Sequence, residues 1–445
     1  MRTLQDASTG SLRRRRASAL ALPIVLAFIA PVPRLEAASG GVQVSFEQAS
    51  ADLTSPDAKV RLRAVQLLKG AMYPEAALPL VPLLTDAQDE IQLEAIAAEL
   101  NIFLADPIVP KTRKALIVEV RNAVQAEPAF SAGPGALGAR RVPIEVLTGL
   151  RSAARDDNPR VAIEALYAFG TLAIQPAGDA RRTLLRAAGP DIAPFIGSSD
   201  PAMRYAAVRV IGRVFAKRAK DEPIDSTIGD AVITALNDKD RAVKVAAMLA
   251  LGSMRYERGV QALTDLFSYY GKGELAEAAL YGLSQIAHPT SAPLFIAQLS
   301  SKSSSLRGIA IEGLARVGDR SNLAAIQSAL DQEKEQTVTL AGAFALVLLG
   351  NGTTDQVADA LSRSRLRDQA KRYLIEIAPG RTGAFAHQLL DSDPQIRIDT
   401  IDALGLAGDA SAIAVLEPLT KDADPQVSRA AERAVARLGQ PTPQP

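Results

Sequence analysis

Apolar residues along most of this chain recur at helical spacing, in short segments that come in pairs from about residue 45 onward. The second segments of these pairs share one register, as in Ala165–Gly170 (ALYAFG), Ala207–Gly212 (AVRVIG) and Thr400–Gly405 (TIDALG). Small residues fall where a neighbouring helix must approach closely. The pattern therefore predicts helical hairpins, each of which buries its apolar face only by stacking on the next one.

Polar turns inside the pairs mark where the second helices begin. Several turns read Asp-Pro or Asn-Pro, which supplies an N-cap side chain and then a residue without an N–H to leave unpaired. In four units a basic residue follows an acidic one by four positions, so that the two side chains share one helical face. These pairs are Asp57 and Arg61, Asp200 and Arg204, Asp240 and Lys244, and Asp393 and Arg397.

Together, the paired helices, the Asp-Pro turn, apolar-basic dipeptides such as Val60-Arg61 and an Ala-Leu-Gly second helix resemble HEAT repeats. The period near 31 residues in the C-terminal half resembles the bacterial variety called phycobilisome-lyase-like. The resemblance covers nearly all of 45–439 in about eleven units. It implies an all-α, right-handed solenoid of stacked helical hairpins of the HEAT or armadillo type. It also implies that the four acid-base pairs form a structural ladder between adjacent repeats.

Other units depart from the ladder pattern, since Ser303 precedes Arg307 and Asp424 is followed by Ser428. Two segments depart from the repeats altogether. Residues 126–142 are rich in Gly, Ala and Pro, which predicts an irregular insert. Residues 440–445 are rich in Pro, which predicts a disordered tail.

The first 38 residues show the order of a secretory signal peptide. Arg13–Arg16 form a basic cluster, Ala17–Ala30 form an apolar run, and small residues follow at Ala37 and Ala38. We expect cleavage near these two alanines and an exported chain, either periplasmic or extracellular, without a transmembrane span in its mature part. An uncleaved anchor is the alternative, and the export route stays open.

Composition excludes several kinds of chemistry. The chain has no cysteine, which removes thiol nucleophiles, thiolate metal sites and disulfides. Of the two histidines, His288 lies between two repeats and His387 lies on a first helix. We interpret the first as a loop or capping residue and the second as a solvent-facing or locally hydrogen-bonded one. Iron-binding HEAT-like hydroxylases use His-Glu motifs, which this chain lacks, and we predict neither a metal nor a cofactor.

Charge is unevenly distributed along the chain. Residues 111–220 carry a net charge of +9, whereas 39–110 and 221–445 carry −6 each. Second helices line the concave side in HEAT solenoids, so the resemblance implies a basic patch there that could bind an acidic partner segment. The alternative is that Arg204 belongs to the ladder and the other basic residues only solvate an exposed face. The candidate binding residues are Arg209, Arg213, Lys217 and Arg218.

These observations favour a non-catalytic protein-binding scaffold or adaptor in the cell envelope. Its partner is expected to be a protein with an acidic segment and not a nucleic acid, given the export signal. One alternative is an enzyme or enzyme-associated subunit on the same scaffold, lyase-like or oxidoreductase-like by family analogy alone. Another is a structural spacer. An enzyme would require carboxylates that converge in one deep cleft.

Overall fold

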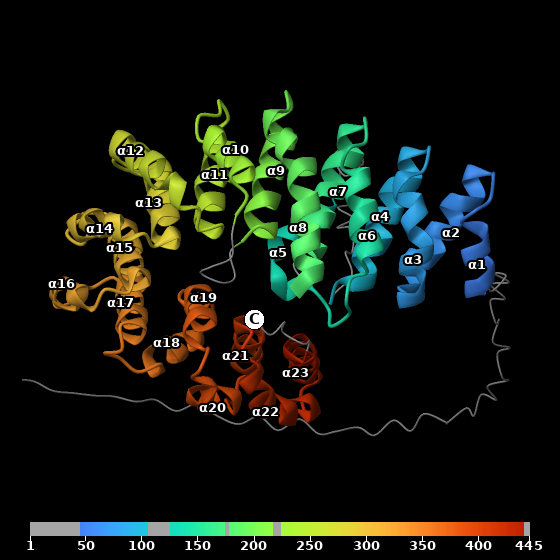
Figure 1. The fold of residues 1–445 in the computed structure, drawn as a ribbon. Coiled ribbons are helices and arrows are strands. Elements are labelled where there is room, and N and C mark those ends of the chain that lie inside the picture. Colours follow the sequence, from blue (N-terminus) through green and yellow to red (C-terminus); the bar gives the residue numbers. More distant parts are fainter. Residues whose placement is uncertain (1–44, 106–124, 174–177, 217–223, 440–445) are drawn as a thin grey trace, which may run out of the picture. The chain divides into compact units, whose positions relative to one another are not determined.

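The computed structural model describes residues 45–105, 125–173, 178–216 and 224–439, which belong to one compact unit. The predicted signal peptide at 1–38 and the predicted tail at 440–445 lie outside the described residues. Within them the fold is an all-α solenoid of eleven helical hairpins, and the hairpins carry no β-strand in this described part. Figure 1 shows the hairpins following one another along an arc.

Each hairpin has a first helix that is often short. Several first helices are extended by 3-10 turns, as at Val81–Thr85, where Pro82 cannot donate an α-helical hydrogen bond. The outer position of α12, α14 and α16 is visible in Figure 1. The first helices are α1 (Phe46–Asp52), α3 (Ala77–Leu80), α6 (Ile144–Ala153), α8 (Gly178–Ile192), α10 (Ser226–Ala235), α12 (Val260–Tyr270), α14 (Ala292–Gln298), α16 (Leu323–Leu330), α18 (Asp355–Asp359), α20 (Ala386–Leu389) and α22 (Ile413–Leu416).

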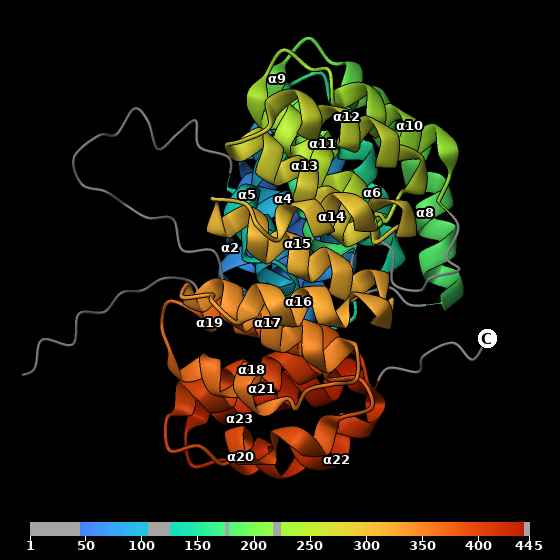
Figure 2. The ribbon, with the colours of Figure 1, turned by 90° about the vertical axis from the view of Figure 1, so that its left-hand side faces the viewer.

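The second helices are longer and pack on one another in sequence order, as the turned view in Figure 2 shows from α13 to α23. They are α2 (Ala58–Ala71), α4 (Asp89–Phe103), α7 (Pro159–Leu172), α9 (Pro201–Val214), α11 (Arg241–Ser253), α13 (Glu274–Ile286), α15 (Ser304–Val317), α17 (Gln336–Leu348), α19 (Arg367–Ile377), α21 (Pro394–Ala407) and α23 (Pro425–Leu438).

The second helices begin at the N-cap residues that the sequence predicts. Asp200 precedes Pro201 and accepts a hydrogen bond from the N–H of Ala202 at 2.9 Å. Asp57, Asp240, Asp393 and Asp424 cap their helices through the same side-chain oxygen. Such a cap satisfies a backbone donor that the helix leaves free.

Close packing between second helices explains the shared register of small residues. A Cβ atom on Gly212 of α9 would come within 2.8 Å of Ala250 on α11. One on Gly405 of α21 would come equally close to Ala434 on α23. Both distances are shorter than atomic contact permits, so glycine sets how closely these neighbouring helices approach.

One expectation is wrong. Residues 126–132 of the insert are not irregular, because they form a helix, α5 (Ala126–Ala132), followed by a 3-10 turn at Pro134–Ala136. Glu164 on α7 stabilises the start of α5, since its carboxylate accepts from the N–H groups of Gln125 at 2.6 Å and Ala126 at 2.7 Å. The C-terminal side of the insert is held by the end of α4, because the N–H of Gly138 donates to the carbonyl of Phe103 at 2.8 Å.

No helix among the described residues combines the length and the apolar character that a membrane span requires.

Candidate functional site

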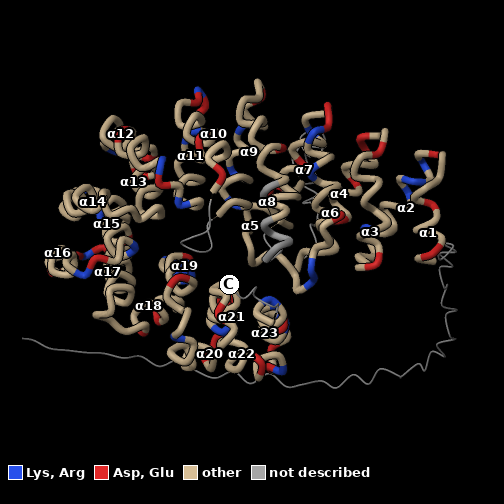
Figure 3. Tube along the Cα trace, in the orientation of Figure 1, with Lys and Arg blue, Asp and Glu red and all other residues tan. Residues whose placement is uncertain are grey.

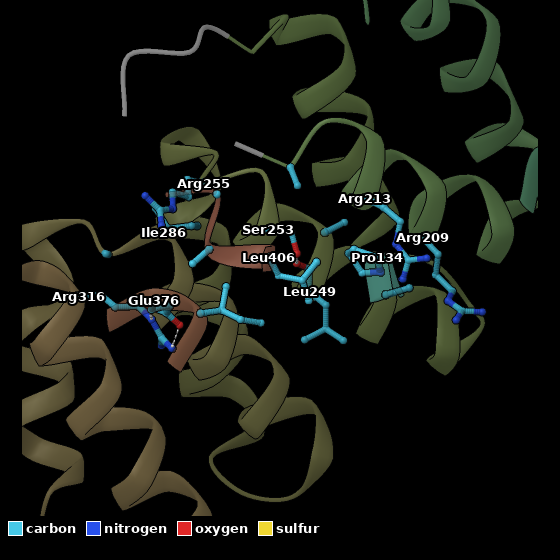
Figure 4. A pocket seen from close by; sticks show the side chains of 18 of the residues that line it. Pro134, Arg209, Arg213, Leu249, Ser253, Arg255, Ile286, Arg316, Glu376 and Leu406 are labelled. Carbon is cyan, nitrogen blue, oxygen red and sulfur yellow. Dashed lines mark hydrogen bonds and ion pairs between the residues drawn. The ribbon is translucent and has the colours of Figure 1, made fainter. Parts of the chain in front are cut away.

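The last turns of the second helices enclose a cavity of about 1730 Å³. Its lining contains the thirteenth residue after the N-cap of every second helix from α9 to α23, and we call these residues the cavity row. Figure 4 shows several of them from close by. The cavity row is Arg213, Ser253, Ile286, Arg316, Leu348, Pro379, Leu406 and Arg437.

The C-terminal unit reaches the insert across the cavity. The guanidinium of Arg437 on α23 donates a hydrogen bond to the carbonyl oxygen of Pro134 at 3.3 Å, although the two residues are 303 positions apart in the sequence. Helix α21 also contacts the 3-10 turn at Pro134–Ala136. The insert therefore forms one wall of the cavity, and the last units form another.

Arg209, a predicted binding residue, is engaged by α5. It donates hydrogen bonds to Glu127 Oε1 at 2.6 Å and to Ser131 Oγ at 2.9 Å. Its guanidinium also lies over the rings of Phe130 and Tyr167, at 5.0 and 5.5 Å from their centroids. These contacts neutralise the charge and cover the group, so Arg209 anchors the insert to the wall of the solenoid.

Arg213 behaves differently. It donates to the carbonyl oxygen of Phe130 and lies 3.6 Å from the centroid of that ring. Burial lowers the pKa of Arg213 to about 10, and the charge of Arg209 adds to this effect. No described carboxylate lies within ion-pair distance of Arg213. The other two residues of the predicted patch, Lys217 and Arg218, lie outside the described residues.

Arg316 is the most heavily bonded member of the cavity row. Two of its nitrogens donate to Glu376, at 2.8 and 2.9 Å, and a third donates to Glu312 at 2.9 Å. Tyr373 donates to the other oxygen of Glu312 at 2.5 Å. Burial acts to lower the pKa of Arg316, but the hydrogen bonds and charges of Glu376 and Glu312 outweigh it and raise that pKa. The group is a buried ion network that joins α15 to α19.

The middle of the cavity is apolar. Leu249 on α11 is 39% exposed although it is a large hydrophobic residue, and it lines the cavity together with Ile286 and Leu406. In the view of Figure 4, Leu249 and Leu406 lie between Arg213 and Arg255. The site therefore combines an apolar floor with cationic ends.

The basic residues of the ladder bind other acids than those of the predicted pairs. Arg61, Arg204 and Arg397 each pair with an acid of the next unit, which lies two residues before the next N-cap. Arg204 donates to both oxygens of Asp238, at 2.7 and 2.9 Å. Figure 3 shows basic and acidic positions side by side at such turns. The observed rungs are Arg61 with Asp86, Arg204 with Asp238, Arg307 with Glu333, and Arg397 with Asp422.

The predicted acids do not bind these basic residues because they cap their own helices. Asp57, Asp200, Asp240 and Asp393 direct their carboxylates to backbone N–H groups as N-caps. Lys244 has no rung of this kind, because Gly271 occupies the place of the acid in the next unit. The sequence held a partial signal for the true acids, since Asp-x-Asp at 238–240 and 422–424 places Asp238 and Asp422 two residues before an N-cap.

Neither histidine contributes to the cavity. His288 caps a 3-10 turn, where its Nδ1 lies 2.7 Å from Thr290 Oγ1, and His387 is exposed. In the part of the chain that the structure describes, no three His, Asp or Glu side chains are grouped so that they could hold a metal ion.

This chain is similar to two solved structures and to one protein family. An engineered protein is 19% identical, with 88% of this chain and 98% of that chain covered and a TM-score of 0.43. A chain from the structure of Kap95p with RanGDP is 16% identical, with 88% and 55% covered and a TM-score of 0.38. A search of curated proteins gives no match. The family model of HEAT repeats matches residues 190–284 and 384–445, and the chain therefore contains HEAT repeats.

Proposed function

We propose that this protein is a non-catalytic scaffold that binds a segment of a partner protein in its cavity. A HEAT-repeat solenoid is consistent with such a role, because its second helices leave a continuous surface after stacking. The observation that carries the proposal is the apolar floor of the cavity, where stacking leaves Leu249 39% exposed and Leu406 half-buried. At about 1730 Å³ the cavity is larger than the roughly 300–1,000 Å³ of small-molecule pockets, which favours a larger occupant.

Affinity capture with the full chain tests this proposal. The variant Leu249→Arg places a long cation on the apolar floor, and we expect it to lose the partner that the wild type captures from native extract. Leu390→Arg is the matched control, since Leu390 is 81% exposed and lies outside the cavity. Capture that survives Leu249→Arg would place the binding site elsewhere. Capture of nothing by the wild type would favour a spacer or an enzyme.

We also propose that the scaffold is exported and works in the periplasm or outside the cell. The order of basic, apolar and small residues in 1–38 supports this. The N-terminal mass of the protein recovered from the envelope provides the test, with a start near Ala38 expected and a start at Met1 contradicting cleavage.

The period near 31 residues further supports assignment of these repeats to the short phycobilisome-lyase-like variety, which is part of the same proposal.

A further inference from the structure

Several second helices end in a left-handed turn, and in three of them the residue with positive φ is not glycine, namely Met72, Arg255 and Ala287. The fifteenth residue after the N-cap is Gly318, Gly350 or Gly408 in three units, with φ of 79°, 71° and 77°. The same place holds Met72 in the unit of α2, with φ of 51°, and Arg255 in the unit of α11, with φ of 49°. A side chain at such a φ crowds the backbone, which is why glycine is favoured at this position.

The turn itself does not need an arginine. At Arg255, its N–H donates to the carbonyl of Gly252 at 2.9 Å, and the next N–H donates to Leu251 at 3.0 Å. Gly350 makes the same two hydrogen bonds at the end of α17, at 3.2 and 2.8 Å. Both are the C-terminal motif in which glycine normally serves. Because glycine closes this turn elsewhere in the chain and Met72 does so in α2, the turn does not require the charge of an arginine.

The side chain of Arg255 is exposed at the edge of the cavity. No hydrogen bond or ion pair to its guanidinium is found among the described residues. It lies at one end of the apolar floor, opposite Arg213 in the view of Figure 4. An unpaired cation on a strained backbone beside an apolar surface is an arrangement that a bound anion would complete.

The charge balance of the cavity lining points the same way. Of its acids, Glu274 pairs with Arg241 at 2.7 Å and Glu376 pairs with Arg316, which leaves Glu257. Three lining arginines have no carboxylate within ion-pair distance among the described residues, and these are Arg213, Arg255 and Arg437. The unpaired charge of the lining is therefore positive.

The insert shows which chemistry this surface accepts. Helix α5 offers a carboxylate, Glu127, and an aromatic ring, Phe130, to the neighbouring residues Arg209 and Arg213. Acidic and apolar groups thus already occupy one end of the concave surface. At the other end of the apolar floor, Arg255 lines the cavity together with Leu249 and Leu406, and no carboxylate of the described chain pairs with its guanidinium.

We propose that Arg255 is a recognition residue that pairs with a carboxylate of a partner segment, whose adjacent apolar side chains pack on Leu249 and Leu406. The inference rests on the proposed function and specifies its partner as an acidic, apolar peptide segment. The affinity of the protein for this segment falls with added salt, because the attraction between exposed charges contributes to binding.

Fluorescence anisotropy with the full chain and three labelled twelve-residue peptides tests the inference. One peptide alternates Leu and Glu, one alternates Leu and Lys, and one alternates Ser and Glu. We expect the Leu-Glu peptide alone to bind. Arg255→Gly should weaken this binding about tenfold or more, since a charge-assisted pair is lost. The same substitution should leave the melting temperature unchanged or higher, because glycine relieves the turn.

Met72→Gly is the matched control. Met72 also lies fifteen residues after its N-cap, has φ of 51° and lies outside the cavity. It should gain stability in the same way without any change in peptide binding. If Arg255 served only to offset the helix dipole of α11, its replacement would lower the melting temperature and leave binding intact.

Three results would overturn the inference: equal binding by wild type and Arg255→Gly, stronger binding of the Leu-Lys peptide, or equal binding of the Ser-Glu peptide. Failure of all three peptides would also overturn it. The proposed function would nevertheless stand if Leu249→Arg, but not Leu390→Arg, lost a partner captured from native extract.

Discussion

Arginines occupy two different rows of the second helices, and the two rows have different surroundings. In the ladder, Arg61, Arg204, Arg307 and Arg397 follow their N-caps by four residues, and each binds an acid of the next unit. In the cavity row, nine residues further along, only Arg316 has carboxylate partners among the described residues. Arginines therefore join neighbouring units near the N-terminal ends of the second helices. Near the C-terminal ends, Arg213 and Arg437 have no carboxylate partner among the described residues. The comparison shows that partners, more than position in the repeat, decide what an arginine does.

The largest effect is expected where a cavity arginine is paired. Arg316→Ala leaves Glu312 and Glu376 without their cation, and Arg316 is only 7% exposed. Breaking a buried ion pair from one side destabilises by about 3–5 kcal/mol. Urea unfolding followed by circular dichroism measures the loss. Arg255→Ala provides the contrast, with an expected change within about 0.5 kcal/mol. Equal stabilities of the two variants would remove the distinction between paired and unpaired cavity arginines.

A ladder arginine should matter less, because its ion pair is nearer to solvent. Arg204→Ala removes both hydrogen bonds to Asp238 and the bonds to the carbonyls of Ser198 and Ser199. We expect a measurable loss of stability that is smaller than that of Arg316→Ala, since these charge-assisted hydrogen bonds lie nearer to solvent. The double-mutant cycle of Arg204→Ala with Asp238→Ala checks that the loss belongs to this pair. Strictly additive effects would show that the rung contributes no coupling.

The ladder also makes stability depend on pH. The hydrogen bond from Arg307 lowers the pKa of Glu333 from its ordinary value of 4.5 to about 2, in a side chain that is 5% exposed. A depressed folded pKa means that this contribution is complete above pH 4.5 and is lost as pH falls toward 2. Glu333→Gln should therefore flatten the decline of the melting temperature between these values. Glu335→Gln, which removes the same charge from an exposed N-cap, should leave the decline as it is in the wild type.

Much of the fold follows from the sequence, because local rules decide it. Asp-Pro turns, the helical period and the small residues near Gly212 and Gly405 specify the hairpins and their contact with the next hairpin. Each of these features acts within a unit or between neighbours, so a single sequence contains enough information. The direction of the Arg204 side chain toward the next unit follows from the same local geometry. Its acidic partner does not, because the pattern predicts the N-cap Asp200 and the structure shows Asp238.

The cavity could not be predicted in the same way. Its closure depends on the contact of Arg437 with Pro134, and that contact results from small rotations accumulated over many units. The sequence predicts an open basic patch at Arg209 and Arg213. They instead hold α5, whose Gly- and Pro-rich flanks concealed a short helix stabilised by Glu164. Tertiary contact, which the local pattern does not contain, decides that region.

The smallest expected effect sharpens the comparison within the ladder. Lys244 stands four residues after its N-cap, at the same place as Arg204, but Gly271 takes the position of the acid in the next unit. Lys244→Ala should change the free energy of unfolding by no more than about 0.5 kcal/mol, because the half-buried Lys244 has no ion-pair partner among the described residues to lose. A loss comparable to that of Arg204→Ala, measured by the same urea unfolding, would mean that the fourth position stabilises through its side-chain packing. The carboxylate two residues before the next N-cap would then no longer define the ladder.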